Sequence, residues 1–448
     1  MKKVFCRLLP ALFLAALPAT VNAESSVDST SILRIQHDSG AGVPGKTLAP
    51  LTQFLGVDLD KLGDGNLSAH LYGWGQVNLA DRSPNLSSSD RFDGSLTYGY
   101  LQYRFKNANA RVRAGRLFVN EGIINEQVDG VSAHTDLPYG FGVSSFGGAT
   151  VHTVHVPDAG TDGKGDGIFG GRVNYRKSGL LEIGFSGVYE TKAPTRNTLP
   201  FGVLPGSYGD HRVVGGDIWI SPVSMLQLSG HTSYNAETEK LAEHSYLLQL
   251  TPVKDLVLSA NFDEQHDRDY FYSSILFADM IKDLGQESRS FGGSASYAIV
   301  KNGEISADYK HYSRDIGKAE RFGGELRGSF LDNSLRSGLS YHYLRAGSDF
   351  AISPIFSATG SFQEVRCYLM RDTKSYFAAL DVIDYLFKKP VDNKNSAWEA
   401  SGSLGYHLKP DLALSGDLSY GENPQYNNEF KGLIRLTYNM TSGKGATK

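Results

Sequence analysis

The sequence predicts an all-β protein, a transmembrane antiparallel up-and-down β-barrel of about 20 strands, with roughly 18 to 22 possible. Three observations predict it. Apolar and polar residues alternate along many segments of strand length. Turn-forming residues join these segments into hairpins. The chain also begins with an export signal. A large closed sheet with one apolar and one charged face is typical of a barrel with lipid outside and water inside.

The clearest hairpin lies between Arg321 and Arg345. Even-numbered positions from 322 to 330 carry Phe, Gly and Leu, whereas the odd-numbered positions between them carry Gly, Glu, Arg and Ser. Residues 331–334 (LDNS) are turn formers, and the return strand again separates Leu and Tyr from Arg, Ser and His. One such hairpin is only marginally stable in water, so many in one chain indicate a closed sheet.

The N-terminus predicts the compartment and the division of the chain. Residues 1–23 carry a basic start, a short apolar run and a Val-Asn-Ala cleavage site, and they read as a secretory signal peptide. Residues 24–66 are expected to form a periplasmic segment with a short helix at 47–62, either a cap over the barrel rim or a lumen plug. The barrel is expected over 67–440, followed by a polar tail at 441–448.

Twenty segments of the chain after Leu67 read as strands. Short turns fall on every second connection, and mostly longer polar segments fall on the others, which indicates short periplasmic turns, long outer loops and an even strand count. The expected strands are 67–80, 92–105, 111–119, 127–136, 141–151, 168–177, 180–191, 211–221, 224–236, 243–252, 255–266, 288–299, 304–313, 320–330, 335–345, 362–372, 375–386, 396–407, 411–421 and 428–440.

The size of the barrel predicts which face points outward, because barrels of about sixteen or more strands enclose water. Apolar side chains should therefore face lipid; they include Leu181, Ile183, Phe185, Leu256, Leu258, Phe262, Leu412, Leu414, Leu418, Phe430, Ile434, Leu436 and Tyr438. The charged side chains expected to line the pore are Arg111, Arg113, Arg172, Arg176, Asp263, Glu304, Asp308, Arg321, Glu325, Arg327, Arg336, Asp417 and Arg435. Both signs occur, so we expect at most a weak preference for anions.

One outer loop, residues 267–287, has apolar residues at helical spacing. It is expected either to fold into the lumen as a constriction or plug, or to pack as a lid on neighbouring loops. The residues concerned are Phe271, Ile275, Phe277, Met280, Ile281 and Leu284.

The sequence supports neither a cofactor nor an enzyme. Only Cys367 follows the expected cleavage site, and the chain has no Cys-x-x-Cys-His run for haem. The aspartates within 158–167 match no calcium loop, so this segment reads as a solvated outer loop. His134 and Asp136 lie near a strand end without a nucleophile motif, so a barrel hydrolase is only a remote alternative. The net charge of −4 gives no indication of a nucleic-acid partner.

The alternating hairpins, the export signal and the closing strand at 430–440 together resemble Gram-negative outer-membrane porins. Residues 50–56 (PLTQFLG) leading into 67–75 (LSAHLYGWG) resemble porin-like proteins of metal-reducing bacteria, some of which sheathe multihaem c-type cytochromes. The first resemblance implies an outer-membrane porin for small hydrophilic solutes, and such porins often form homo-oligomers. The second implies a sheath subunit of an electron conduit, with a cytochrome as its partner. Both alternatives stay open at this point.

Overall fold

The computed structural model describes residues 24–40, 46–80, 92–151, 167–194, 208–236, 239–266, 288–314, 317–347, 360–391, 393–424 and 426–442. The expected signal peptide, the 267–287 segment with its six apolar residues, and residues 443–448 of the expected tail lie outside them. Within the described part, one short 3-10 helix, η1 (Pro138–Gly140), accompanies the strands. No helix there is long and apolar enough to span a membrane.

All strands belong to one antiparallel sheet. They are β1 (Glu24–Gly40), β2 (Lys46–Leu48), β3 (Pro50–Leu62), β4 (Leu67–Asn78), β5 (Phe92–Arg104), β6 (Ala110–Glu121), β7 (Ile124–Asp136), β8 (Phe141–Thr150), β9 (Ile168–Lys177), β10 (Leu181–Pro194), β11 (Tyr208–Val223), β12 (Leu226–Asn235), β13 (Lys240–Val253), β14 (Leu256–Gln265), β15 (Ser288–Val300), β16 (Gly303–Arg314), β17 (Gly317–Phe330), β18 (Leu335–Ala346), β19 (Phe362–Asp372), β20 (Tyr376–Val391), β21 (Lys394–Lys409), β22 (Leu412–Glu422) and β23 (Tyr426–Ser442).

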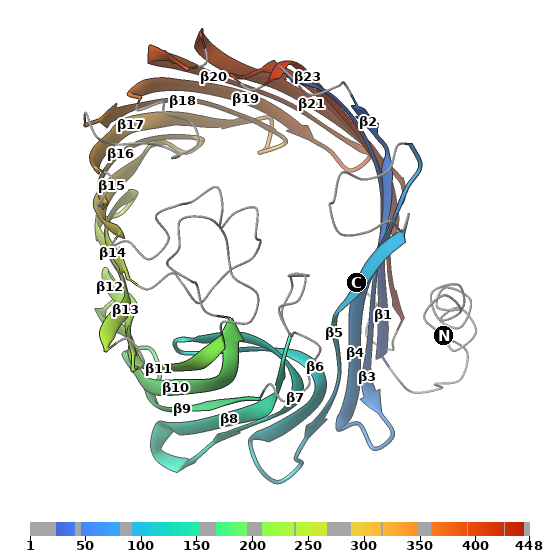
Figure 1. Ribbon diagram of the computed structural model, residues 1–448, viewed down its shortest axis with the longest axis vertical. Coiled ribbons are helices and arrows are strands. Elements are labelled where there is room, and N and C mark those ends of the chain that lie inside the picture. The colour runs from blue at the N-terminus through green and yellow to red at the C-terminus, as the bar shows by residue number, and fades with distance from the viewer. Residues whose placement is uncertain are drawn as a thin grey trace.

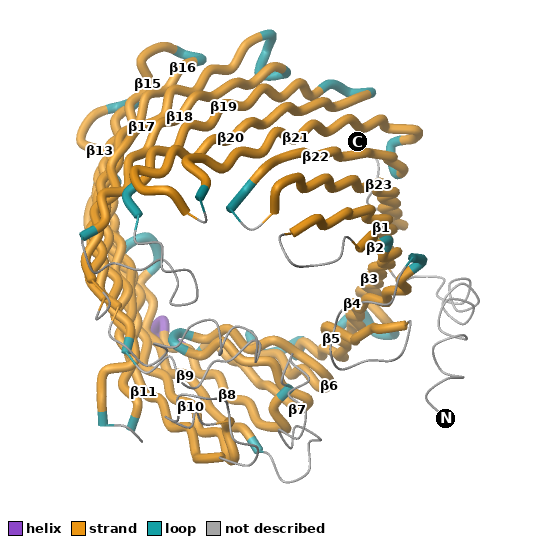
Figure 2. The backbone as a smooth tube through the Cα atoms, turned by 45° about the horizontal axis from the view of Figure 1, so that its top comes forward, coloured by secondary structure: helices purple, strands orange, loops and turns teal. Residues whose placement is uncertain are grey.

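The sheet closes on itself into a ring (Figure 1). From β3 to β23 each strand pairs with the next one in sequence, and β1 pairs with β3 on one side and with β23 on the other. β2 and β3 pair with β1 in one continuous register, interrupted only at Ala49, so the 23 strands make a wall of 22. Figure 2 shows β23, β1 and β3 side by side at the closure. The predicted transmembrane-type barrel fold is confirmed, and all twenty predicted strands are present.

The expectation for residues 24–66 is wrong. Their described parts, 24–40 and 46–66, contain no helix. β1 and β3 are two further wall strands, so the described wall runs from Glu24 to Ser442. The apolar residues of 50–62 have helical spacing, but Leu51, Leu55, Val57 and Leu59 also fit the period of two of a strand. Pairing with the neighbouring strands favours the strand. β1 is rich in Ser, and hydrogen bonding to strands on both sides compensates for its low strand propensity.

Connections differ between the two ends of the barrel. Every second one, beginning with the turn at 63–66 and ending with that at 410–411, is short, as the sequence predicts. Both ends of the wall lie at this short-turn end, because Ser25 is paired with Ser442. At the opposite end several connections are much longer, but β6 and β7, β16 and β17, and β20 and β21 are each joined by only two residues, which for β6 and β7 are Gly122 and Ile123.

The two faces of the wall have the reverse of the usual polarity of a folded protein. Phe185 is 65% exposed and Leu418 60%, whereas Ser186, the neighbour of Phe185 on β10, is only 1% exposed. Ile183, Leu414, Phe430, Ile434 and Leu436, all expected to face outward, are exposed as well. A surface that is apolar outside and polar within suits lipid on one side and water on the other.

Candidate functional site

One hairpin leaves the wall and marks the inner face. The far ends of β6 and β7 lie along the inner side of β8 to β11 (Figure 1). The backbone N–H of Ile123 at their tip donates a hydrogen bond to Ser186 Oγ over 3.2 Å. Ser186 therefore points inward. Because side chains alternate along a strand, every second residue from Ser186 on β10, and the residues paired with these on adjacent strands, also face inward.

Two glycines allow the hairpin to bend. Gly115 and Gly130 face each other across β6 and β7, and Gly115 has φ 131°, which favours glycine. A Cβ added to Gly130 would lie closer than 3.0 Å to the carbonyl oxygen of Gly147. A Cβ added to Gly115 would lie within the same distance of the carbonyl oxygen of Gly99. The strands approach too closely at this bend for any side chain.

Beyond the bend, the hairpin and the wall share a small apolar core inside the barrel. Leu117 and Val128 are fully buried, and the folded ends also contribute Val119 and Ile124. The wall contributes Phe146, Ile168, Val188 and Val213. At the twenty-odd cal/mol per Å² gained when apolar surface is buried, a cluster of this size holds the hairpin firmly in place.

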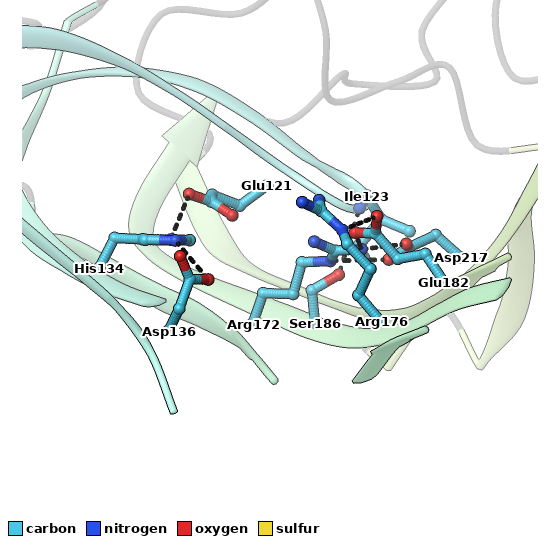
Figure 3. Close-up of polar contacts among 9 residues, drawn as sticks. All are labelled: Glu121, Ile123, His134, Asp136, Arg172, Arg176, Glu182, Ser186 and Asp217. Carbon is cyan, nitrogen blue, oxygen red and sulfur yellow. Dashed lines mark hydrogen bonds and ion pairs between the residues drawn. The ribbon is translucent and has the colours of Figure 1, made fainter. Parts of the chain in front are cut away.

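A charged cluster anchors the tip of the hairpin (Figure 3). Arg172 on β9 donates from Nε to Asp217 Oδ1 on β11 over 3.0 Å, and from Nη2 to Glu182 Oε1 on β10 over 3.0 Å. Arg176 donates to the other oxygen of Glu182 over 2.8 Å. A Cβ on Gly122, whose φ is 64°, would collide with Asp217 and Ser186, so the hairpin tip rests directly on this cluster.

Beside the hairpin, Arg111 and Arg113 line one partly enclosed cavity together with His134, Ser144 and Glu121. Glu121 Oε1 lies 3.6 Å from His134 Nδ1, and Asp136 Oδ1 lies 3.4 Å from His134 Nε2 (Figure 3). The Ser144 hydroxyl forms no hydrogen bond within the described residues, so it is not joined to His134 as a nucleophile would be to its base.

The opposite wall carries a wetter network of alternating charge. Arg321 lies 3.2 Å from Asp308 and 3.9 Å from Glu364, and His342 lies between the same two acids. Further pairs on the same face are Arg327 with Glu325 at 2.7 Å and with Glu304 at 3.8 Å, Lys310 with Asp263 at 3.7 Å, Arg366 with Asp381 at 2.7 Å, and Arg435 with Asp417 at 3.9 Å. Charges of both signs therefore lie within ion-pair distance over much of the ring.

The residues that the sequence analysis proposed as pore-lining thus fall into three groups. Most join ion pairs, whereas Arg111 and Arg113 line the cavity under the hairpin. Arg336 on β18 is exposed and enters no ion pair within the described ranges. Several acid partners were not predicted from the sequence, among them Glu182, Asp217, Glu364 and Asp381, and neither was the inward hairpin. The signal for the hairpin was present: residues 117–119 are Leu-Phe-Val, and such an apolar run breaks the alternation.

Metal binding has little support in this arrangement. No group of three or more His, Cys, Asp or Glu side chains within the described ranges could hold a metal ion.

Comparison with known proteins supports the fold. No protein-family model matches the sequence, and no curated protein matches it either. The ferric enterobactin receptor PfeA of Pseudomonas aeruginosa is similar in structure, with a TM-score of 0.55 at 12% identity, over 94% of this chain and 81% of the receptor. PfeA in complex with BCV-L6 aligns with a TM-score of 0.56, also at 12% identity, over 94% of this chain and 82% of the receptor. This likeness shows the fold of an outer-membrane barrel and nothing finer.

Proposed function

We propose that this chain is an outer-membrane pore through which ions and small hydrophilic solutes diffuse passively. The observation that carries the proposal is the closed ring of 22 strands with apolar side chains outside and paired charges inside. A lipid-facing charge near the membrane centre costs about 2–4 kcal/mol, so this distribution of side chains suits a wall between lipid and water.

The size and charge of the interior shape the expected pore. A barrel of this many strands is too wide for the side chains of its wall to fill, and among the described residues the β6–β7 hairpin narrows it from one side. Because the wall charges are largely paired, strong selection between anions and cations is not expected. A weak preference for anions is the most that the arginines would produce.

Conductance of the purified chain in planar lipid bilayers tests the proposal. We expect discrete current steps whose size rises with salt concentration, because water-filled pores conduct bulk ions. Protein that has been unfolded by boiling is the control and should give none. A bilayer that stays sealed at high load of folded protein would refute the pore.

A second candidate is a sheath subunit of a porin–cytochrome electron conduit. The barrel size favours it, because known outer-membrane barrels of about 22 strands have a plugged lumen, so this ring has room for a partner. The haem would come from that partner, since the chain has no Cys-x-x-Cys-His run. The test is co-expression with the products of neighbouring genes. Haem absorbance that co-purifies with the barrel supports the sheath, and a haem-free barrel that conducts alone supports the pore.

A further inference from the structure

Under the folded β6–β7 hairpin, polar atoms without a hydrogen bond gather in one cavity. Within the described residues, Arg111 Nε, Arg113 Nε, His134 Nδ1 and Ser144 Oγ are buried and make none. All four residues line the same cavity. The strand register explains why they meet: Arg111 is opposite His134 on the next strand, and His134 is opposite Ser144 on the one after.

The charge in this cavity is not balanced by neighbouring acids. Arg172, Arg321, Arg327 and Arg366 each have a carboxylate within 4 Å. Neither Arg111 nor Arg113 has one among the residues that the structure describes, although Arg113 lies 5.9 Å from the ring centre of Tyr100. Glu121, which faces His134, is the one acid that lines the cavity, and Asp136 lies on the other side of the His134 ring, outside the lining. Two guanidinium groups with one acid in the lining leave an excess of positive charge there.

The hairpin makes the cavity small and sheltered. Residues 118–121 of β6 line it on the hairpin side, and Phe146 of β8 lines it on the wall side. It has room for about one water-sized particle, roughly 20 Å³. Ser144, on the wall side, is only 8% exposed. A ligand that reaches these donors must therefore be small, and the guanidinium and hydroxyl groups that await it favour an anion.

We propose that Arg111, Arg113, His134 and Ser144 bind a small inorganic anion of halide size beneath the β6–β7 hairpin. The bound anion accepts hydrogen bonds from the two Nε–H groups and the serine hydroxyl, and it balances the arginine charges. It thereby helps to hold the hairpin against the wall. This goes beyond the proposed pore, because the site would bind its ion whether or not the barrel conducts.

Bromide provides a direct probe, because its anomalous scattering identifies it in a crystal. Crystals of the full chain in sodium bromide should show an anomalous peak within hydrogen-bonding distance of Arg111 Nε, Arg113 Nε and Ser144 Oγ. In detergent solution, bromide should raise the unfolding midpoint more than sodium gluconate at equal ionic strength, because a ligand of the native state stabilises it. Gluconate is too large for the cavity.

Two double variants separate specific binding from a general effect of charge. R111Q/R113Q should lose both the anomalous peak and the bromide-dependent rise. K254Q/K301Q removes two positive charges from exposed short turns and should keep both. If R111Q/R113Q fails to fold, S144A, which keeps both charges, should weaken the bromide dependence several-fold. A wild-type crystal without the peak, or an equal bromide effect in the arginine variant, overturns the site, whatever the conductance experiment shows.

Discussion

The wall from β8 to β11 and the wall from β16 to β20 are built from similar antiparallel strands, but their inner faces differ. Between β8 and β11 the inner face carries Phe146, Ile168, Val188 and Val213, all buried under the hairpin. Between β16 and β20 it carries half-exposed charges such as Asp308 and Arg321, each with a partner on a neighbouring strand. The covered wall combines an apolar core with one buried charged cluster, Arg172, Glu182 and Asp217, under the hairpin tip, whereas the open wall is charged and half-exposed.

This difference shows that the apolar or polar character of each face of a barrel strand depends on what contacts that face. An uncovered inner face must be polar because it contacts water, whereas a covered one gains free energy from apolar contacts. Covering also determines how much an ion pair contributes to the free energy of folding. Arg172, under the hairpin, has a side chain only 10% exposed, while that of Arg366 on the open wall is 52% exposed. Each prediction below tests whether covering is the cause of the contrast.

The largest effect is expected from Gly130→Ala. The new Cβ would lie within 3.0 Å of a backbone oxygen, which cannot move aside as a side chain can, so the hairpin has to shift away from the wall. We expect a loss of at least about 3 kcal/mol, the upper end of the range for overpacking. Urea unfolding of the folded barrel in detergent, followed by electrophoretic mobility with and without heating, measures it.

Gly402→Ala is the matched control on the open side of the barrel. A Cβ there would meet its nearest atom, the carbonyl oxygen of Ala379, at 4.0 Å, which is ordinary contact. Its midpoint should equal the wild-type value or lie slightly above it, since alanine restricts the unfolded chain. Equal losses in the two variants would show that the close packing at the bend is not special.

A smaller loss is expected from Asp217→Asn, which weakens the charged cluster beneath the hairpin tip. Arg172 keeps Glu182 as a partner, so the cost should be about 1–3 kcal/mol rather than the 3–5 kcal/mol of a fully broken buried pair. The hairpin should also become more mobile, which faster amide exchange at Ile123 would show. Unchanged exchange at Ile123 would mean that the apolar core alone holds the hairpin.

The plain wall was predictable from sequence, and the covered wall was not. In β17 and β18, strict alternation predicted both strands, their turn and their charged face, because each residue contacts only lipid, water or a neighbouring strand. β1 carries too few apolar residues to be recognised alone, since its pairing with β3 and β23 holds it in the sheet. Local patterns do not contain this long-range pairing.

The inward hairpin was missed for a related reason. Gly115 and Gly130 read as ordinary barrel glycines, and only their pairing across two strands makes them a bend. Leu117 and Val119 were counted as part of a plain wall strand, although they pack against residues up to almost a hundred positions away along the chain, such as Val213. The arginines were proposed as one pore-lining set, which stays a prediction. Their pairing with acids such as Glu182 and Asp381 depends on a strand register that the sequence does not specify.

The smallest effect is expected from Asp381→Asn on the open wall. Asp381 pairs with Arg366 at 2.7 Å, a closer approach than many pairs in the barrel, yet both side chains contact the interior solvent. An exposed pair of this kind contributes about 0–1 kcal/mol, so the urea midpoint should hardly change. Removal of a negative charge should instead move the reversal potential in a KCl gradient toward that of chloride. If Asp381→Asn costs as much stability as Asp217→Asn, solvent contact does not distinguish the two walls, and the contrast must come from pairing geometry alone.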